Sequence, residues 1–270
     1  MQWEGNIRKM RSELGEVVNY TLPLYDILEP GDEVAMNELV GKSIQLNFDH
    51  AIHCVVTGKK IKKVFGEGMS YDAFMNSPEA SPSIIRPELS RIHEGIALRD
   101  FEWEMKHHMT PHIVYLSKTA GAKVGVTRER QVPTRWIDQG AVEALAIART
   151  PYRQAAGLIE VALKDHIADK TNWQRMLKGE VDEADLKLIR DGLISFVPDA
   201  QKQFLLPDSE IVRITYPVLA YPPKVKSLKL DKEPTIEGKL MGIKGQYLLF
   251  DDGRVINIRS HAGYRVKLEA

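Results

Sequence analysis

The sequence predicts an α+β protein in which a central β-β-α-β-α unit is flanked by a β-rich region built from the N- and C-terminal strands. Three observations predict it. Apolar and polar side chains alternate near both ends of the chain, as they do in half-buried strands. The strongest helical periodicity lies in the middle of the chain, and Gly, Pro and Asp-Gly turns separate the predicted strands.

The composition is that of an ordinary globular chain. Of 270 residues, 43% are hydrophobic and 27% are charged, enough for one large or two modest domains. Lys plus Arg and Asp plus Glu each number 37, and this balance excludes a polybasic protein that binds nucleic acid through bulk charge. The single cysteine, Cys54, excludes a disulfide framework. We expect a cytoplasmic protein, because no apolar run reaches the roughly 18 residues of a membrane span and the N-terminus lacks the apolar core of a signal peptide.

The first 111 residues divide into two parts. Residues 1–50 form a β-rich segment, with alternation that predicts strands at 2–9, 16–22 and 42–48. The intervening stretch 24–40 has an ambiguous period that leaves room for a short helix. Residues 51–111 are predicted to be loop-rich, because prolines and serines interrupt every pattern there.

Residues 112–198 carry the clearest pattern. Two strands, 112–120 and 123–129, are joined by a tight turn at Gly121-Ala122 and followed by a helix that starts at Pro133. A short apolar strand at 144–151 precedes the best helix of the chain, 152–168. One face of this helix is apolar at Ala155, Ala156, Ile159, Ala162, Leu163 and Ile167. The order is therefore β-β-α-β-α.

The remaining elements are a helix at 181–193, for which Asp182 is the predicted N-cap, and a β-rich C-terminal segment at 199–270. This segment is expected to hold a strand at 211–216, a hairpin around Asp252-Gly253 and a closing strand at 265–268. We expect the C-terminal strands to pair with residues 1–50.

Chemistry-bearing residues cluster in the central unit. Residues 112–180 contain 11 Lys or Arg against 7 Asp or Glu, although the whole chain is neutral. A phenol, guanidinium groups and a carboxylate are what a phosphodiester-cleaving site with one metal ion requires. Candidates for these roles, with Gly125 allowing close approach of a ligand, are Tyr115, Arg128, Arg130, Arg135 and Glu160.

This pattern resembles the core of the GIY-YIG nucleases, which has the same element order. The first motif falls on Ile113-Val114-Tyr115, the second on Lys123-Val124-Gly125, and the motif arginine is Arg135 before Trp136. The resemblance implies that Tyr115 acts in general-base chemistry, that Arg135 steadies the phosphate and that Glu160 binds magnesium. It places the asparagine of the family on Asn172.

Three positions depart from the GIY-YIG pattern. Ile113 replaces a glycine, Lys123 replaces a tyrosine and Gln139 replaces a histidine. The loss of the second tyrosine makes hydrolytic activity less secure, whereas Lys123 is suited to holding a phosphate. The predicted catalytic set is Tyr115, Lys123, Arg128, Arg135 and Glu160, with Glu160 as the metal ligand. The predicted nucleic-acid-binding set is His112, Arg130, Trp136 and Asn172.

A second resemblance covers nearly the whole chain. The strings VYL, KVGVTR, PTRWIDQGA, GLIEVAL, DKTNW and GIKGQYL resemble an uncharacterised bacterial family, the domain of unknown function twenty-seven ninety-seven. Members of that family carry zinc-type cysteine pairs before the core. The corresponding positions here are Cys54, Thr57, Ser70, Ala73, Ser83 and Ser90. We therefore expect no zinc, with packing in its place ordering residues 51–109.

Each assignment has a plainer alternative. Tyr115 fits a half-buried packing role in a strand, and Glu160 can pair with Lys164 one helical turn away. Arg135 can be a surface charge, with Arg128 as its substitute, and Asn172 can simply end a helix. The histidines at 50, 53, 93, 107, 108 and 112, together with Cys54, offer enough ligand atoms for zinc but show no paired-ligand spacing.

Two functions therefore stand side by side. The first is a nucleic-acid-acting protein with a magnesium-dependent, endonuclease-like phosphodiesterase site. The alternative is a catalytically inactive module that binds nucleic acid or a protein. A weaker third option is an RNA-modifying enzyme. The sequence leaves DNA against RNA and the oligomeric state open, and it predicts no membrane partner.

Overall fold

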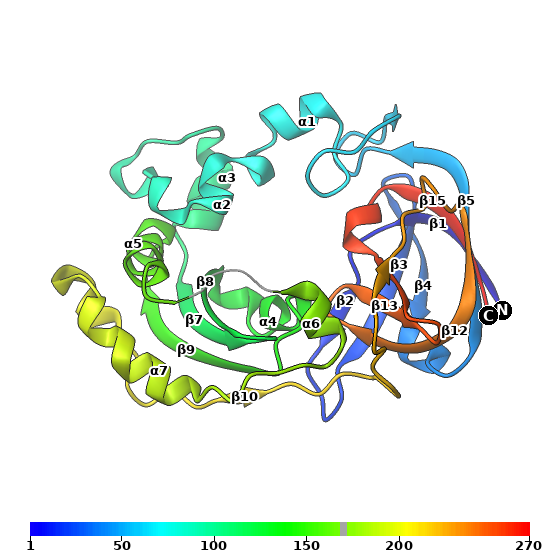
Figure 1. Cartoon of the computed structure of the whole chain (residues 1–270). Helices are drawn as coiled ribbons and strands as arrows, with labels where there is room; N and C mark the ends of the chain where they lie inside the picture. The colour runs from blue at the N-terminus through cyan, green and yellow to red at the C-terminus, as the bar shows by residue number, and fades with distance from the viewer. Residues whose placement is uncertain (168–171) are drawn as a thin grey trace.

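The computed structural model, which describes residues 1–167 and 172–270, consists of two β-sheets with helices around the smaller one. The larger sheet curls at one side of the molecule, and the smaller sheet lies beside it with helices on its outer side (Figure 1). The α+β class is therefore confirmed. In the described residues no helix is long and apolar enough to cross a membrane.

The larger sheet joins the two ends of the chain. Its neighbouring strands run in the order β11-β14-β13-β12-β5-β15-β1-β3-β2, with β4 paired to β3 and β6 to β5. The strands are β1 (Gln2–Ile7), β2 (Arg11–Glu13), β3 (Asn19–Asp26), β4 (Glu29–Ala35), β5 (Ser43–His53), β6 (Lys60–Ile61), β11 (Lys226–Ser227), β12 (Thr235–Lys244), β13 (Tyr247–Phe250), β14 (Arg254–Asn257) and β15 (Tyr264–Glu269). Because β15 pairs with both β1 and β5, the expected pairing of N- and C-terminal strands is confirmed.

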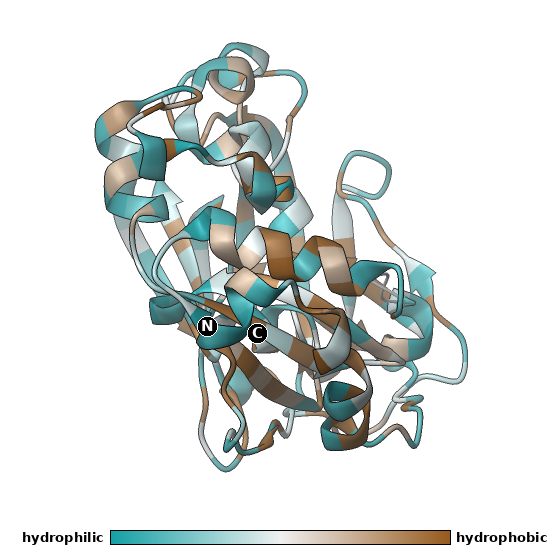
Figure 2. Ribbon diagram, turned by 90° about the vertical axis from the view of Figure 1, so that its left-hand side faces the viewer, coloured by the Kyte–Doolittle hydropathy of each residue, from teal (hydrophilic) through white to brown (hydrophobic). Residues whose placement is uncertain are grey.

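Of two local predictions in this sheet, the hairpin is confirmed and the stretch 24–40 is mostly strand. The hairpin at Asp252-Gly253 joins β13 to β14 as predicted. Residues 29–35 form strand β4 because they pair with β3, and only Met36–Leu39 is helical, as a 3₁₀ turn. Hydrophobic residues occur in both the strands and the helices, and many of the outer loops are hydrophilic (Figure 2).

The smaller sheet contains β10 (Val212–Arg213), β9 (Glu143–Thr150), β7 (His112–Lys118) and β8 (Ala122–Arg128), in that spatial order. Helix α4 (Thr134–Asp138) lies between β8 and β9 in the chain, and helix α5 (Arg153–Lys164) follows β9. Residues 112–164 therefore have the predicted β-β-α-β-α order, with β7 in the centre of the sheet. Two further helices follow, α6 (Trp173–Leu177) and α7 (Leu186–Leu193).

Helix α5 packs on the smaller sheet through the predicted apolar face. Ala156, Ile159 and Leu163 are fully buried in a cluster with Val114, Leu116 and Leu145 of the sheet. Gly157 lies against the backbone of a neighbouring segment, because a Cβ at this position would stand 2.2 Å from the nitrogen of Glu88. The residues just before Glu88 are thereby held directly against α5.

Residues 51–109 contain more regular structure than the predicted loops. Short helices occur here because serine and aspartate side chains cap them: Ser70 and Asp100 accept hydrogen bonds from the first turns of their helices. The helices are α1 (Tyr71–Asn76), α2 (Pro82–Ile85) and α3 (Phe101–His108). Cys54 is fully buried beside Met69 and Ala73, and its Sγ accepts a hydrogen bond of 3.2 Å from the nitrogen of Ser70.

Two predicted boundaries are wrong. Asp185, and not Asp182, caps α7, with its carboxylate accepting from the nitrogens of Lys187 and Leu188 at 2.7 and 3.2 Å. Asp182 is held outside the helix because its nitrogen donates to the carbonyl of Ala120. The strand predicted at 211–216 shrinks to the two residues of β10, which pair with the first residues of β9.

Candidate functional site

A cavity of about 830 Å³ lies where the smaller sheet, helices α3 to α5 and the edge of the larger sheet meet. All five predicted catalytic residues line it, together with one predicted nucleic-acid-binding residue. These six are Tyr115, Lys123, Arg128, Arg130, Arg135 and Glu160. Among the described residues, eight Lys or Arg and four Asp or Glu line the cavity, so its wall carries the positive charge that the whole chain lacks.

Tyr115 is placed by the strand pairing. It lies opposite Gly125 in the β7–β8 ladder, and its Cζ and hydroxyl oxygen both lie 2.8 Å from where a Cβ of residue 125 would stand. The ring therefore lies across the glycine, as the sequence suggested for a close approach at this position. Trp136 of α4 packs behind it, with ring centroids 5.8 Å apart.

The Tyr115 side chain is fully buried, and this burial raises the pKa of its hydroxyl. The neighbouring charge of Arg135 and the side chain of Gln139 lower the pKa, and the charge of Glu160 raises it again. Burial outweighs the lowering influences. The phenol is therefore protonated at neutral pH and acts there as a hydrogen-bond donor or a positioned weak acid.

Glu160 supplies a carboxylate to the same cavity. It lies on α5 with its side chain only 11% exposed, and the Nζ of Lys164, one turn further along, is 3.8 Å from Oε2. The helical pairing that the sequence suggested is therefore present, but it does not point Glu160 away from the cavity. Magnesium sites commonly use one or two carboxylates and complete their ligand set with water and substrate phosphate. Glu160 fits that class of ligand.

Two arginines and a histidine form one side of the cavity. His107 Nδ1 accepts hydrogen bonds from Arg128 Nη1 at 2.7 Å and from Arg130 Nη2 at 2.5 Å. Burial and then these two guanidinium charges lower the pKa of His107, so its ring is neutral beside them. Among the described residues neither arginine lies within 4.0 Å of a carboxylate oxygen, and the same holds for Arg135. All three arginines line the cavity, and the charge of Glu79, which lines it too, acts on Arg128.

Arg153 is a cavity residue that the sequence analysis missed. Its Nε and Nη2 donate to the carbonyls of Ser83 and Ile84 at 2.7 and 2.9 Å, and burial lowers its pKa to about 10. A sequence signal was present, because Arg153 precedes Glu160 by seven residues and so shares its helix face. Trp103 and His107 of α3, and Lys9 and Arg259 in connections between strands of the larger sheet, also line the cavity without any local signal of that kind.

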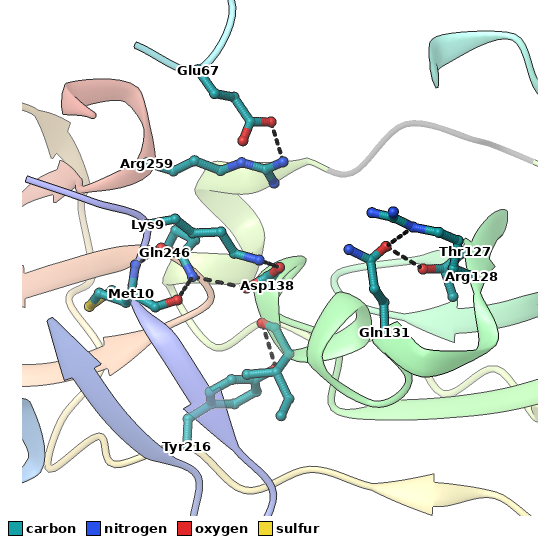
Figure 3. A network of polar contacts seen from close by, with 11 residues as sticks. Lys9, Met10, Glu67, Thr127, Arg128, Gln131, Asp138, Tyr216, Gln246 and Arg259 are labelled. Carbon is teal, nitrogen blue, oxygen red and sulfur yellow. Dashed lines mark hydrogen bonds and ion pairs between the residues drawn. The ribbon is translucent and has the colours of Figure 1, made fainter. Parts of the chain in front are cut away.

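The larger sheet holds helix α4 in place through Asp138. The Asp138 side chain is only 2% exposed and forms an ion pair with Lys9, while Gln246 Nε2 donates to its Oδ1 at 2.9 Å. Gln246 also bonds both backbone groups of Met10. In Figure 3, Lys9 and Arg259 lie on one side of the view and Arg128 on the other, with α4 and Asp138 between them. Arg135 and Gln139 flank Asp138 in the chain, so this network fixes the helix that presents them.

Three predicted residues lie outside the cavity lining. His112 is fully buried behind Arg153, with its Nδ1 donating to the carbonyl of Thr110 at 2.7 Å and its Nε2 3.4 Å from Arg153 Nη1. Trp136 is buried against Tyr115. Asn172 caps α6, and its Oδ1 accepts from the nitrogen of Arg175 at 3.1 Å.

No metal-binding group of three or more His, Cys, Asp or Glu side chains occurs within residues 1–167 and 172–270. Cys54 and His53 lie near the β5 end, while His93, His107, His108 and His112 belong to the region of α3 and β7. Burial, and then the charge of Arg153, lowers the pKa of both His108 and His112 to about 3. Both rings are therefore neutral; His108 lines the cavity, and His112 lies behind it beside Arg153.

Comparison with known proteins places these residues in a family. The family model described as "Protein of unknown function (DUF2797)" matches residues 41–266, a stretch that includes the Tyr115–Gly125 pair, α4 and α5. Neither a curated protein nor a solved structure matches the chain. Since the matched stretch is most of the sequence, the chain belongs to the DUF2797 family.

Proposed function

We propose that this protein acts on nucleic acid, and that its cavity is a magnesium-dependent, GIY-YIG-like phosphodiesterase site. One observation carries the proposal: Tyr115, Arg135 and Glu160, which the sequence separates by up to 45 residues, line the same cavity. Arg128, Arg130 and Lys123 line it too. The combination of phenol, guanidinium and carboxylate is the set that hydrolysis of a phosphodiester requires.

In this proposal the arginines bind the scissile phosphate. Guanidinium groups form paired hydrogen bonds with phosphate oxygens and stabilise the negative charge that develops on them. Among the described residues Arg128, Arg130 and Arg135 form no ion pair within 4.0 Å, although the charge of Glu79 acts on Arg128, so their guanidinium groups are available to substrate phosphate. Glu160 would hold the magnesium ion, which supplies Lewis-acid activation of the phosphoryl group when bound.

Tyr115 orients the attacking water in this scheme. Because burial raises the pKa of its hydroxyl, the resting phenol keeps its proton at neutral pH. Its position beside Arg135 and Glu160 lets it donate a hydrogen bond next to the phosphate. The positive charge of Arg135 favours this hydrogen bond, because it lowers the pKa of the phenol and makes it a stronger donor.

The second candidate function is a catalytically inactive nucleic-acid-binding module. The complete burial of Tyr115 favours it, because a buried phenol with a raised pKa is a poor base. The arginine-rich wall would serve binding equally well. A protein-binding module is less favoured by this cavity, since its wall is dominated by cationic side chains that suit a polyanion.

A cleavage assay separates these functions. Labelled single-stranded, duplex and branched DNA and RNA are incubated with the protein in magnesium, in manganese and in EDTA. Glu160→Gln tests the carboxylate, and Glu210→Gln, whose side chain is 85% exposed and outside the cavity, is the matched control. Arg135→Ala is paired in the same way with the 82%-exposed Arg213→Ala.

We expect metal-dependent cleavage that Glu160→Gln and Arg135→Ala reduce by at least about 100-fold and that both control variants retain. Binding without cleavage by the wild-type protein would establish the inactive module instead. Cleavage that survives in EDTA, or in Glu160→Gln, would contradict the proposed site.

A further inference from the structure

We propose that the cavity accepts an unpaired nucleotide, whose base packs on an apolar ledge beside the arginines. The ledge is formed by Ile84, Ile85 and Trp103, and the adjoining phosphate binds to Arg128 and Arg130. The inference rests on the proposed function and narrows its substrate to nucleic acid with a single-stranded segment at the site.

The ledge is held in place from two sides. Arg153 donates to the carbonyls of Ser83 and Ile84, and the backbone that follows packs directly on Gly157 of α5. Despite this rigid backbone, Ile85 is 82% exposed and Ile84 is 37% exposed, and both line the cavity. Exposed apolar side chains beside cationic groups suit a partner that carries both an apolar face and an anion.

Trp103 joins the ledge to the arginines. It lines the same cavity from α3, and its ring centroid lies 4.3 Å from that of His107. His107 in turn is bonded to Arg128 and Arg130. An aromatic surface and two guanidinium groups are thus separated by a single side chain, which matches the closeness of base and phosphate within one nucleotide.

The size and chemistry of the cavity favour an unpaired strand over a duplex. A volume of about 830 Å³ lies in the range of small-molecule sites, so the cavity can enclose a nucleotide but not a paired helix. A base in a duplex has both faces stacked and cannot contact the ledge. Proteins that bind single strands combine a cationic track for the backbone with aromatic groups that stack on bases, and this cavity offers both.

Binding in EDTA tests the ledge without any contribution from cleavage. The probes are a labelled thymidine 12-mer, a base-free 12-mer of the same charge, a uridine 12-mer and a 12-base-pair duplex. Trp103→Ala and Ile85→Ser remove parts of the ledge; Ile85 is exposed enough for the second variant to fold normally. Phe101→Ala, 51% exposed on the same helix but outside the cavity lining, is the control, and Arg128→Ala removes a phosphate contact.

We expect the thymidine strand to bind about tenfold more tightly than the base-free strand. Trp103→Ala and Ile85→Ser should abolish most of that difference and leave the affinity for the base-free strand unchanged, whereas Arg128→Ala should weaken both. Equal affinity of the wild-type protein for the thymidine and base-free strands, or tighter binding of the duplex, would overturn the proposal that a base packs on the ledge. If only the proposed catalysis is wrong, the result differs: the thymidine strand still binds more tightly than the base-free strand, but it is not cut in magnesium. The uridine strand, which also carries an unpaired pyrimidine, should bind more tightly than the base-free strand as well, and its failure to do so would contradict the ledge.

Discussion

Tyr115 lies directly across Gly125, so that its hydroxyl oxygen and Cζ are 2.8 Å from the position of a Cβ on residue 125. No real Cβ tolerates that separation, and the ring keeps its place only because residue 125 has no side chain. The orientation of the Tyr115 side chain on strand β7 therefore depends on Gly125 of strand β8.

Gly125→Ala is expected to displace the Tyr115 ring, because the added methyl group overlaps it. We predict a loss of roughly 1–3 kcal/mol in the free energy of unfolding, as for other overpacked cores. The cleavage rate should fall at least as far as in Tyr115→Phe. Urea denaturation and the cleavage assay measure the two effects, and full activity in Gly125→Ala would show that the position of the phenol does not matter.

Gly157→Ala is expected to destabilise the protein, although alanine is the better helix former. The new Cβ would stand 2.2 Å from the nitrogen of Glu88, a backbone atom that cannot move freely. We predict a loss of roughly 1–3 kcal/mol. Gly192→Ala in α7 is the matched control, because nothing lies within 4 Å of its Cβ, and it should gain about 0.5–1 kcal/mol from helix propensity. Equal effects of the two substitutions on urea denaturation would contradict the close packing at Gly157.

Asp138→Ala tests the link between α4 and the larger sheet. The substitution leaves Lys9 and Gln246 without the carboxylate that both contact, and the Asp138 side chain is almost fully buried. We predict a loss of roughly 2 kcal/mol, most of it from the one N–H of the Gln246 amide that loses its acceptor, because Lys9 is 35% exposed. Asp138→Asn keeps an acceptor for Gln246 and should lose less. Asp208→Ala, at an exposed position, serves as the control in chemical denaturation.

Acid should destabilise the protein through His108 and His112. The pKa of each is about 3 in the folded protein against 6.5 for an unperturbed histidine, so between those values the unfolded chain binds more protons. Stability is therefore retained above pH 6.5 and falls as the pH decreases toward 3. Each histidine contributes up to about 1.4 kcal/mol per pH unit in that window.

Urea denaturation between pH 7 and 4.5 measures this slope. His112→Gln, which removes one titrating ring, should flatten it, and His50→Gln at an exposed position should leave it unchanged. A slope that is the same in His112→Gln and in the wild-type protein would show that His112 is not the neutral, buried group described above.

Features that depend on residues close together in the sequence could be predicted. The alternation in β15 and in the first half of β5, the apolar face of α5 and the Asp-Gly hairpin are all set by side-chain periodicity and turn chemistry. The same local patterns placed Tyr115 and Gly125 in two neighbouring strands joined by a tight turn. Where local signals compete, prediction failed: Asp182 and Asp185 are both acceptable caps, and a hydrogen bond to Ala120 decided between them.

Part of the site was predictable for the same reason. The resemblance to the GIY-YIG core pointed to Glu160 and Arg135, and both line the cavity. It also pointed to Trp136, which instead is buried against Tyr115, because the angle of α4 against β7 decides which side of that helix faces the cavity.

By itself, the sequence determined the strands of the central unit, the apolar face of helix α5 and the Asp-Gly hairpin, since these depend on local free energies of a few neighbouring residues. The tertiary structure alone decided that Lys9, Trp103, Arg153 and Arg259 share one cavity. They come from four separate elements, so their meeting depends on how two sheets pack and on which buried polar groups find partners there. That free energy is a property of the whole fold, which no single segment of the chain encodes.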